Sequence, residues 1–130
     1  MKQSFRAALF IAAALLMLFG ATGYSLVVVP DLHGDLVEIG VRRSVLGGTL
    51  LHLYFAAIAM FGFATMVTVA AIQAIRGIVP ARIPLAIIVV IYITFGIFAF
   101  SRSHNPHHLG PLATGILLGA ALAIPEPKDH

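Results

Sequence analysis

Four long stretches of this chain contain no charged side chain, and their length constrains the fold more than any other feature. They are residues 7–29, 50–75, 83–100 and 109–124. About 20 residues of helix cross a hydrocarbon core of roughly 30 Å, so three stretches are long enough and the fourth only just spans. Because lipid offers no hydrogen bonds, each stretch must satisfy its own backbone as a helix. The sequence therefore predicts an all-α fold, an integral membrane bundle of four transmembrane helices.

The composition indicates that lipid, rather than water, surrounds these stretches. Of the 130 residues, 60% are apolar and 10% are charged, whereas soluble domains have about 45–50% apolar and about 25% charged residues. A core of this size could not cover so much apolar surface, so the bilayer is the expected partner. The length fits one domain, residues 1–130. The formal charge of +3 is spread over the ends of the stretches, which does not suggest nucleic-acid binding.

The distribution of lysine and arginine predicts the orientation in the membrane. In a four-helix topology five basic residues fall on the side of the two termini and three on the other side. They are Lys2, Arg6, Arg76, Arg82 and Lys128 against Arg42, Arg43 and Arg102. Basic residues are enriched on the cytoplasmic side. We therefore expect both termini in the cytoplasm and a location in a plasma membrane of the bacterial inner-membrane type.

The end of the first stretch is marked by Pro30, which is expected to terminate the helix because proline has no N–H. The polar residues 30–46 then predict a short helix on the membrane surface, in which Asp35 and Glu38 resemble an N-terminal capping pattern; a plain loop is the alternative. The first stretch also resembles a cleaved signal peptide. Its apolar character continues through Val29, which favours a retained helix.

His52 is the residue that most suggests a function, because it lies about one turn inside the second apolar stretch. An ionisable group at such a depth is costly unless it faces the bundle, a ligand or water. Neutral imidazole is a good axial ligand for haem iron, and the preceding Gly47 and Gly48 would let a flat macrocycle approach. The alternative is an interfacial histidine that is hydrogen-bonded to a carbonyl group or a lipid headgroup.

Three further histidines, His104, His107 and His108, lie close together in the loop after the third stretch. They could bind a divalent metal ion. The spacing is not that of a known structural site, and no carboxylate is near in sequence. The alternative is a solvated turn around Asn105 and the following proline.

Tyr92 is the polar residue nearest the middle of the third stretch. Its hydroxyl needs a partner, either a substrate oxygen or a carbonyl group of a neighbouring helix. On the last stretch Gly115 and Gly119 allow close helix contact, within the bundle or between protomers, and a homo-oligomer through this face is expected. No stretch contains Asp, Glu, Lys or Arg, which argues against an ion pump or a proton-driven transporter.

These features together resemble the styrene oxide isomerase family. The resemblance is carried by the four stretches, by His52 near the start of the second, and by Gly-Ile-Phe-Ala-Phe-Ser at 96–101, followed by an Asn/Pro loop and Gly-Pro at 110–111. It implies haem b with His52 as axial ligand, and an intramolecular isomerase that rearranges a small apolar epoxide to an aldehyde, with ferric iron as Lewis acid.

The sequence departs from this family at the two positions that would hold the epoxide oxygen. The family has a tyrosine near the end of the third helix and an asparagine about two turns after the histidine, where this chain has Phe98 and Ile58. Neither side chain can hold an oxygen, so Tyr92 and Asn105 are the candidates for catalytic residues. The alternative function is that of a non-enzymatic accessory or scaffold subunit of a membrane complex.

Overall fold

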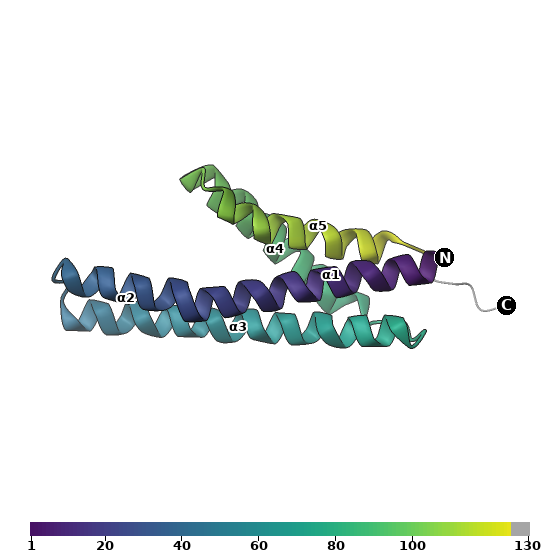
Figure 1. The fold of residues 1–130 in the computed structure, drawn as a ribbon, viewed down its shortest axis with the longest axis horizontal. Coiled ribbons are helices and arrows are strands. Elements are labelled where there is room, and N and C mark those ends of the chain that lie inside the picture. The colour runs from purple at the N-terminus through teal and green to yellow at the C-terminus, as the bar shows by residue number, and fades with distance from the viewer. Residues whose placement is uncertain (126–130) are drawn as a thin grey trace.

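The computed structural model describes residues 1–125. In that part of the chain all regular secondary structure is helical, and there is no strand (Figure 1). The elements are α1 (Lys2–Gly23), the π-helical turn η1 (Tyr24–Val28), α2 (Val29–Glu38), α3 (Arg43–Ile75), α4 (Arg82–Ser103), the 3-10 turn η2 (Pro106–His108) and α5 (Leu109–Ala123). The predicted all-α fold is confirmed. Three segments of the described chain are long and apolar enough to cross a membrane: Lys2–Glu38, Arg43–Ile75 and Arg82–Ser103.

The prediction that Pro30 ends the first helix is wrong. The elements α1, η1 and α2 form one helix of 37 residues, which passes through Pro30. Just before the proline, the N–H of Val29 reaches back five residues to the carbonyl of Tyr24. Proline lacks an N–H and crowds the carbonyl four residues earlier, and a π turn lets a helix continue with a modified bonding pattern. The predicted separate surface helix over 30–46 is therefore wrong: residues 30–38 extend the first helix, residues 39–42 form a turn, and residues 43–46 begin α3.

The turn between α2 and α3 is formed by a glycine that the sequence interpretation overlooked. Gly40 has a φ of +73°, its N–H donates to the carbonyl of Val37, and Val41 N–H donates to Leu36. This arrangement is a Schellman C-terminal motif, in which a glycine supplies the left-handed conformation. Glu38 is thus the last residue of a helix rather than part of an N-terminal cap.

The predicted end of the second helix at Arg76 and Gly77 is confirmed by the same motif. Gly77 has a φ of +75°, and the N–H of Ile78 donates to Gln73 at 2.8 Å. The helix begins earlier than predicted, at Arg43 instead of Leu50, because only the turn at Gly40 separates it from α2. The last predicted helix, residues 109–124, corresponds to α5, which ends one residue earlier, at Ala123.

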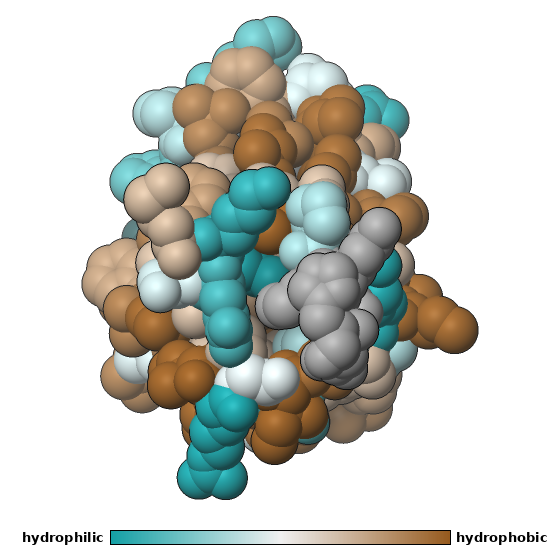
Figure 2. Space-filling view, turned by 90° about the vertical axis from the view of Figure 1, so that its right-hand side faces the viewer, coloured by the Kyte–Doolittle hydropathy of each residue, from teal (hydrophilic) through white to brown (hydrophobic). Residues whose placement is uncertain are grey.

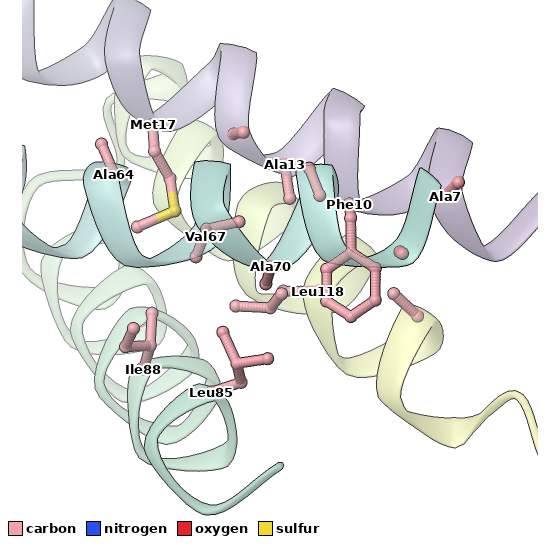
Figure 3. Packing of buried hydrophobic residues seen from close by; sticks show 14 of the residues in the cluster. Ala7, Phe10, Ala13, Met17, Ala64, Val67, Ala70, Leu85, Ile88 and Leu118 are labelled. Carbon is pink, nitrogen blue, oxygen red and sulfur yellow. The ribbon is translucent and has the colours of Figure 1, made fainter. Parts of the chain in front are cut away.

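The helices form two hairpins that cross each other (Figure 1). One hairpin pairs α1 with α3, and the other pairs α4 with α5; α5 also packs along α1, whereas α4 has few contacts with α3. The core lies where the hairpins meet (Figure 3). Its largest fully buried side chains are Phe10, Met17, Val67, Ile88 and Leu118. Alanines on α1 and α3 fill the space between them, which allows these two helices to approach closely.

Glycines set the distance between α4 and α5. A Cβ atom on Gly96 would lie 2.8 Å from the backbone nitrogen of Leu112, and one on Gly115 would lie 3.1 Å from that of Ile93. A Cβ on Gly119 would meet Val89 at 3.4 Å. The small-residue face of the last helix therefore packs inside the chain, against α4.

Candidate functional site

His52 lies on the outer surface of α3, about two and a half turns after the helix begins, and it is exposed. The ring Nδ1 is 2.6 Å from the carbonyl oxygen of Gly48, one turn earlier. A carbonyl oxygen only accepts hydrogen bonds, so Nδ1 carries the proton and donates it. In the neutral ring Nε2 then keeps its lone pair and points away from this bond. A Cβ on Gly47 or Gly48 would meet nothing within 4 Å, so the surface beside the ring is open.

This arrangement fits one axial position of a haem. A metal-ligating histidine usually donates its second ring N–H to a carbonyl or carboxylate, which fixes the tautomer and the ring orientation. The carbonyl of Gly48 accepts such a bond from His52. The same hydrogen bond also satisfies the alternative interpretation of His52 as an interfacial histidine bonded to a carbonyl group. The hydrogen bond to Gly48 is therefore compatible with both interpretations of His52.

The loop after α4 is ordered by backbone and cap hydrogen bonds. His104 ends α4 in the left-handed conformation, with a φ of 52°, and its N–H donates to Phe100 at 2.8 Å. The Asn105 side-chain oxygen accepts the N–H of His107 at 3.0 Å and so caps η2. Across residues 1–125 no group of three or more His, Asp or Glu side chains is placed to hold a metal ion. The structure does not bring the three predicted metal ligands together, and the loop has the form of the solvated turn.

Tyr92 lies in the core and is only 8% exposed. Its ring packs edge-to-face on Phe63 of α3, with centroids 6.4 Å apart and planes at 72°. Its hydroxyl has no hydrogen-bond partner among residues 1–125. A buried hydroxyl without a partner is uncommon in native structures. The carbonyl partner that the sequence suggested is not found.

His52, Tyr92 and Asn105 are not brought together in one chain. Phe63, the neighbour of Tyr92, follows His52 by eleven residues on α3, which corresponds to about 16 Å along the helix axis. Asn105 lies at the tip of the α4–α5 hairpin, and this tip diverges from the α2–α3 hairpin (Figure 1). Ile58 and Phe98, at the family's oxygen-binding positions, are both exposed. The three candidate residues therefore do not form a single active site within the protomer.

Arg6 and Arg82 bind the end of α5, a contact that the sequence did not predict. Buried Arg6, at the start of α1, donates from Nε to Ala121 O at 3.2 Å, and its guanidinium lies 5.7 Å from the centroid of the Phe10 ring. Arg82, at the start of α4, donates from Nη2 to Leu122 O at 2.6 Å. The last carbonyls of a helix have no partner within it, and cations are favourable there. The only signal in the sequence is the absence of a basic residue in the last turn of α5.

A cleft of about 400 Å³ opens beside Arg6, at the end of the molecule that carries this arginine pair. It lies between the start of α1, the turn after α3 and the segment after α5. Its lining includes Lys2, Gln3, Arg6, Ile78, Val79 and Ile124. Figure 2 shows this end of the molecule, where hydrophilic side chains gather near the centre of the face and apolar ones surround them. The cleft thus combines positive charge with an apolar rim.

Comparisons of the chain with protein-family models, with curated proteins and with solved structures found no match. The class of the protein therefore follows from its own residues. It is an all-helical protein with three helical segments that are long and apolar enough to cross a membrane.

Proposed function

We propose that the protein is an integral membrane protein whose helices cross the bilayer four times, with both termini in the cytoplasm of a bacterial-type inner membrane. Large apolar side chains are exposed along all the long helices, among them Phe19, Phe55, Ile83 and Phe95, as expected when lipid is the solvent. The fourth crossing is α5, whose 15 residues rise only about 22 Å. Its contacts with α1 and α4 support this short crossing.

The length of the first helix agrees with this topology. A helix of 37 residues is about 55 Å long, whereas the hydrocarbon core is roughly 30 Å thick. The acidic residues Asp31, Asp35 and Glu38 all lie in its last ten residues, which would extend beyond the hydrocarbon. Phe10 and Met17 of the same helix belong to the core, which supports a retained helix and not a cleaved signal peptide.

The function that the site supports best is binding of haem b, with His52 as the axial ligand. The observation that carries this proposal is the hydrogen bond from Nδ1 to Gly48 O, because it leaves Nε2 available for iron. When bound, ferric haem would supply a Lewis acid, as the resemblance to epoxide isomerases implies. Because His52 is exposed on one protomer, the opposite wall of the site would come from a second copy. We therefore propose a homo-oligomer that meets at this face of α3, since Gly115 and Gly119 pack against α4.

A specific observation favours a second candidate, a non-enzymatic accessory or scaffold subunit. An isomerase acting on a small apolar epoxide needs a donor near the ligand that holds the epoxide oxygen. Asn105 lies at the tip of the α4–α5 hairpin, which diverges from the hairpin that carries His52, and Tyr92 lies in the core about three helical turns along from His52. The second candidate predicts that the protein copurifies with a larger membrane partner in mild detergent.

An absorption spectrum of the purified protein tests the haem proposal. The protein should show a Soret band after reconstitution with haem, and His52→Ala should abolish it. His108→Ala is the matched control, because that ring lies in the loop after α4, and it should leave the band unchanged. A colourless wild-type protein, or an equal band in His52→Ala, would contradict haem ligation by His52.

A further inference from the structure

One end of the molecule is a helical hairpin that projects from the core (Figure 1). We call residues 30–48 the tip; they comprise most of α2, the turn at Gly40 and the start of α3. No residue from Pro30 to Ala56 is buried, whereas seven residues of α1 are, and α2 contacts only η1 and α3. Segments with few buried contacts are the ones that open or move first in a native protein.

The first helix changes its hydrogen bonding where it enters the tip. The N–H of Val29 donates to the carbonyl of Tyr24, five residues back, and the next residue, Pro30, has no N–H to donate. One turn earlier, Ser25 Oγ donates to the carbonyl of Ala21 at 2.8 Å. A π turn, a proline and a side-chain bond of this kind each bend or loosen a helix. All three occur together here, so this segment is the weakest part of the first helix.

A second weak point lies across the hairpin in α3. Gly47 and Gly48 are adjacent inside the helix, where each glycine costs about 0.5–1 kcal/mol relative to alanine. A Cβ on either would meet nothing within 4 Å, so no close contact requires a glycine there, and what the pair supplies is backbone freedom. Pro30 lies ten residues before Gly40 and Gly48 lies eight after it. The two weak points are therefore at similar heights in the hairpin.

The glycine pair is connected to His52 by one carbonyl group. Gly48 O accepts the Nδ1–H of His52 at 2.6 Å, and in an α-helix it also accepts the backbone N–H four residues later, which is that of His52. A bend at Gly47 and Gly48 tilts this carbonyl away from the helix axis. The hydrogen bond that orients the imidazole ring therefore depends on the angle of the tip.

We propose that the tip is a hinged unit, which swings about Tyr24–Pro30 in the first helix and Gly47–Gly48 in α3, and whose angle sets the orientation of the His52 ring. The swing follows from the packing and hydrogen bonding of the tip and does not depend on haem. Its consequence for a ligand rests on the proposed role of His52. By linkage, a ligand on this ring favours the state in which the bond to Gly48 is present.

Distances between spin labels test the motion, and they can be placed freely because the chain contains no cysteine. Phe19→Cys with Val37→Cys spans the hinge of the first helix, and Leu51→Cys with Val69→Cys is the matched control within α3; all four side chains are exposed. Each pair is separated by 18 residues, about 27 Å of straight helix. In lipid discs we expect a distance distribution about twice as wide for the first pair as for the control.

Two variants remove the flexibility from different helices. Pro30→Ala restores an N–H in the first helix, and the double variant Gly47→Ala with Gly48→Ala stiffens α3 without a steric clash. Each should narrow the distribution between positions 19 and 37 toward the control width, because the tip moves as one unit. Equal widths of the two label pairs in the unmodified background, or a width that neither variant narrows, would overturn the proposal. Narrowing by only one of the variants would contradict motion as a unit.

The link to His52 has a separate readout in the haem-free protein. With ¹⁵N-labelled histidine, the Nδ1–H of His52 should exchange with water severalfold more slowly in the double alanine variant than in the wild type, and His52→Gln assigns the signal. An unchanged exchange rate would contradict the link between the tip and the ring. These measurements need no haem, so a protein that shows no Soret band would contradict the proposed haem site and leave the hinge intact.

Discussion

The first helix and α3 run between two ends of the molecule that are held together differently. The arginine end is where α1 and α4 begin and α3 ends, and the histidine end is where α2 ends and α3 begins. At the arginine end, Arg6 and Arg82 connect the starts of α1 and α4 to the last carbonyls of α5. At the histidine end, where α2 ends and α3 begins, the two hairpins diverge (Figure 1). There the hydrogen bond of His52 stays within its own helix, at Gly48.

This difference separates the part of the chain that sets stability from the part where we propose binding. The arginine end satisfies the last backbone groups of α5 with side chains of the same chain. The histidine end carries an exposed ring that is oriented by Gly48, and the proposed haem and second protomer would bind there. Stability should therefore depend mainly on the core and the arginine end.

The largest expected effect on stability comes from adding a side chain where α4 and α5 approach each other most closely. In Gly96→Ala the new Cβ would lie 2.8 Å from the backbone nitrogen of Leu112, so a helix must shift. Overpacking of this kind costs about 1–3 kcal/mol, and more where backbone is in the way. The free energy of unfolding in detergent measures it. Gly62→Ala, where a Cβ meets nothing within 4 Å, is the control and should be neutral or slightly stabilising.

The next effect should come from the arginine pair. Arg6→Ala removes the hydrogen bond to Ala121 and the contact with Phe10, and it leaves a buried carbonyl unsatisfied, which costs about 1–3 kcal/mol. Arg42→Ala removes an equal charge at the histidine end, where the side chain is exposed, and should change the unfolding free energy by less than about 0.5 kcal/mol. Equal losses in the two variants would show that the two ends do not differ in stability.

A smaller effect of the opposite sign is expected for Tyr92. Its hydroxyl is buried without a partner in the described part of the chain, so Tyr92→Phe removes a desolvated polar group and should be neutral or stabilise by about 1 kcal/mol. The same unfolding measurement tests this. A loss of about 1 kcal/mol or more would mean that the hydroxyl has a partner in the membrane, such as a bound ligand. Tyr92 would then again be a candidate for a ligand-binding residue.

Helix type and most helix ends could be predicted from the sequence because they depend on local rules. Charge-free stretches identified the three long apolar helical segments, and the glycine at 77 marked the end of α3. The predicted end of the first helix at Pro30 was wrong, because a helix can continue through a proline when a π turn precedes it. The exception depends on the π-helical hydrogen bonds of Tyr24–Val28, and no residue pattern in this segment predicts them.

The candidate site could be predicted only as single residues. His52 was recognisable because an ionisable group in an apolar stretch is rare, and its bond to Gly48 follows from a spacing of four on one helix. Contacts between distant helices, such as Arg6 with Ala121, depend on how the hairpins cross. The sequence carries no local signal for that crossing, so the arginine pair and the cleft beside it were not predicted.

The smallest effect is expected at the tip of the α4–α5 hairpin and concerns Asn105. Its side-chain oxygen accepts one N–H, that of His107, so Asn105→Ala should lose only about 0.5–1 kcal/mol, as for other helix caps. Asn105→Asp keeps an acceptor at the same position and should retain most of this stability. Hydrogen exchange at His107 would report the loss locally, with α1 and α3 unchanged. If Asn105→Ala instead left the exchange at His107 as it was, the capping role of the Asn105 side chain would be wrong.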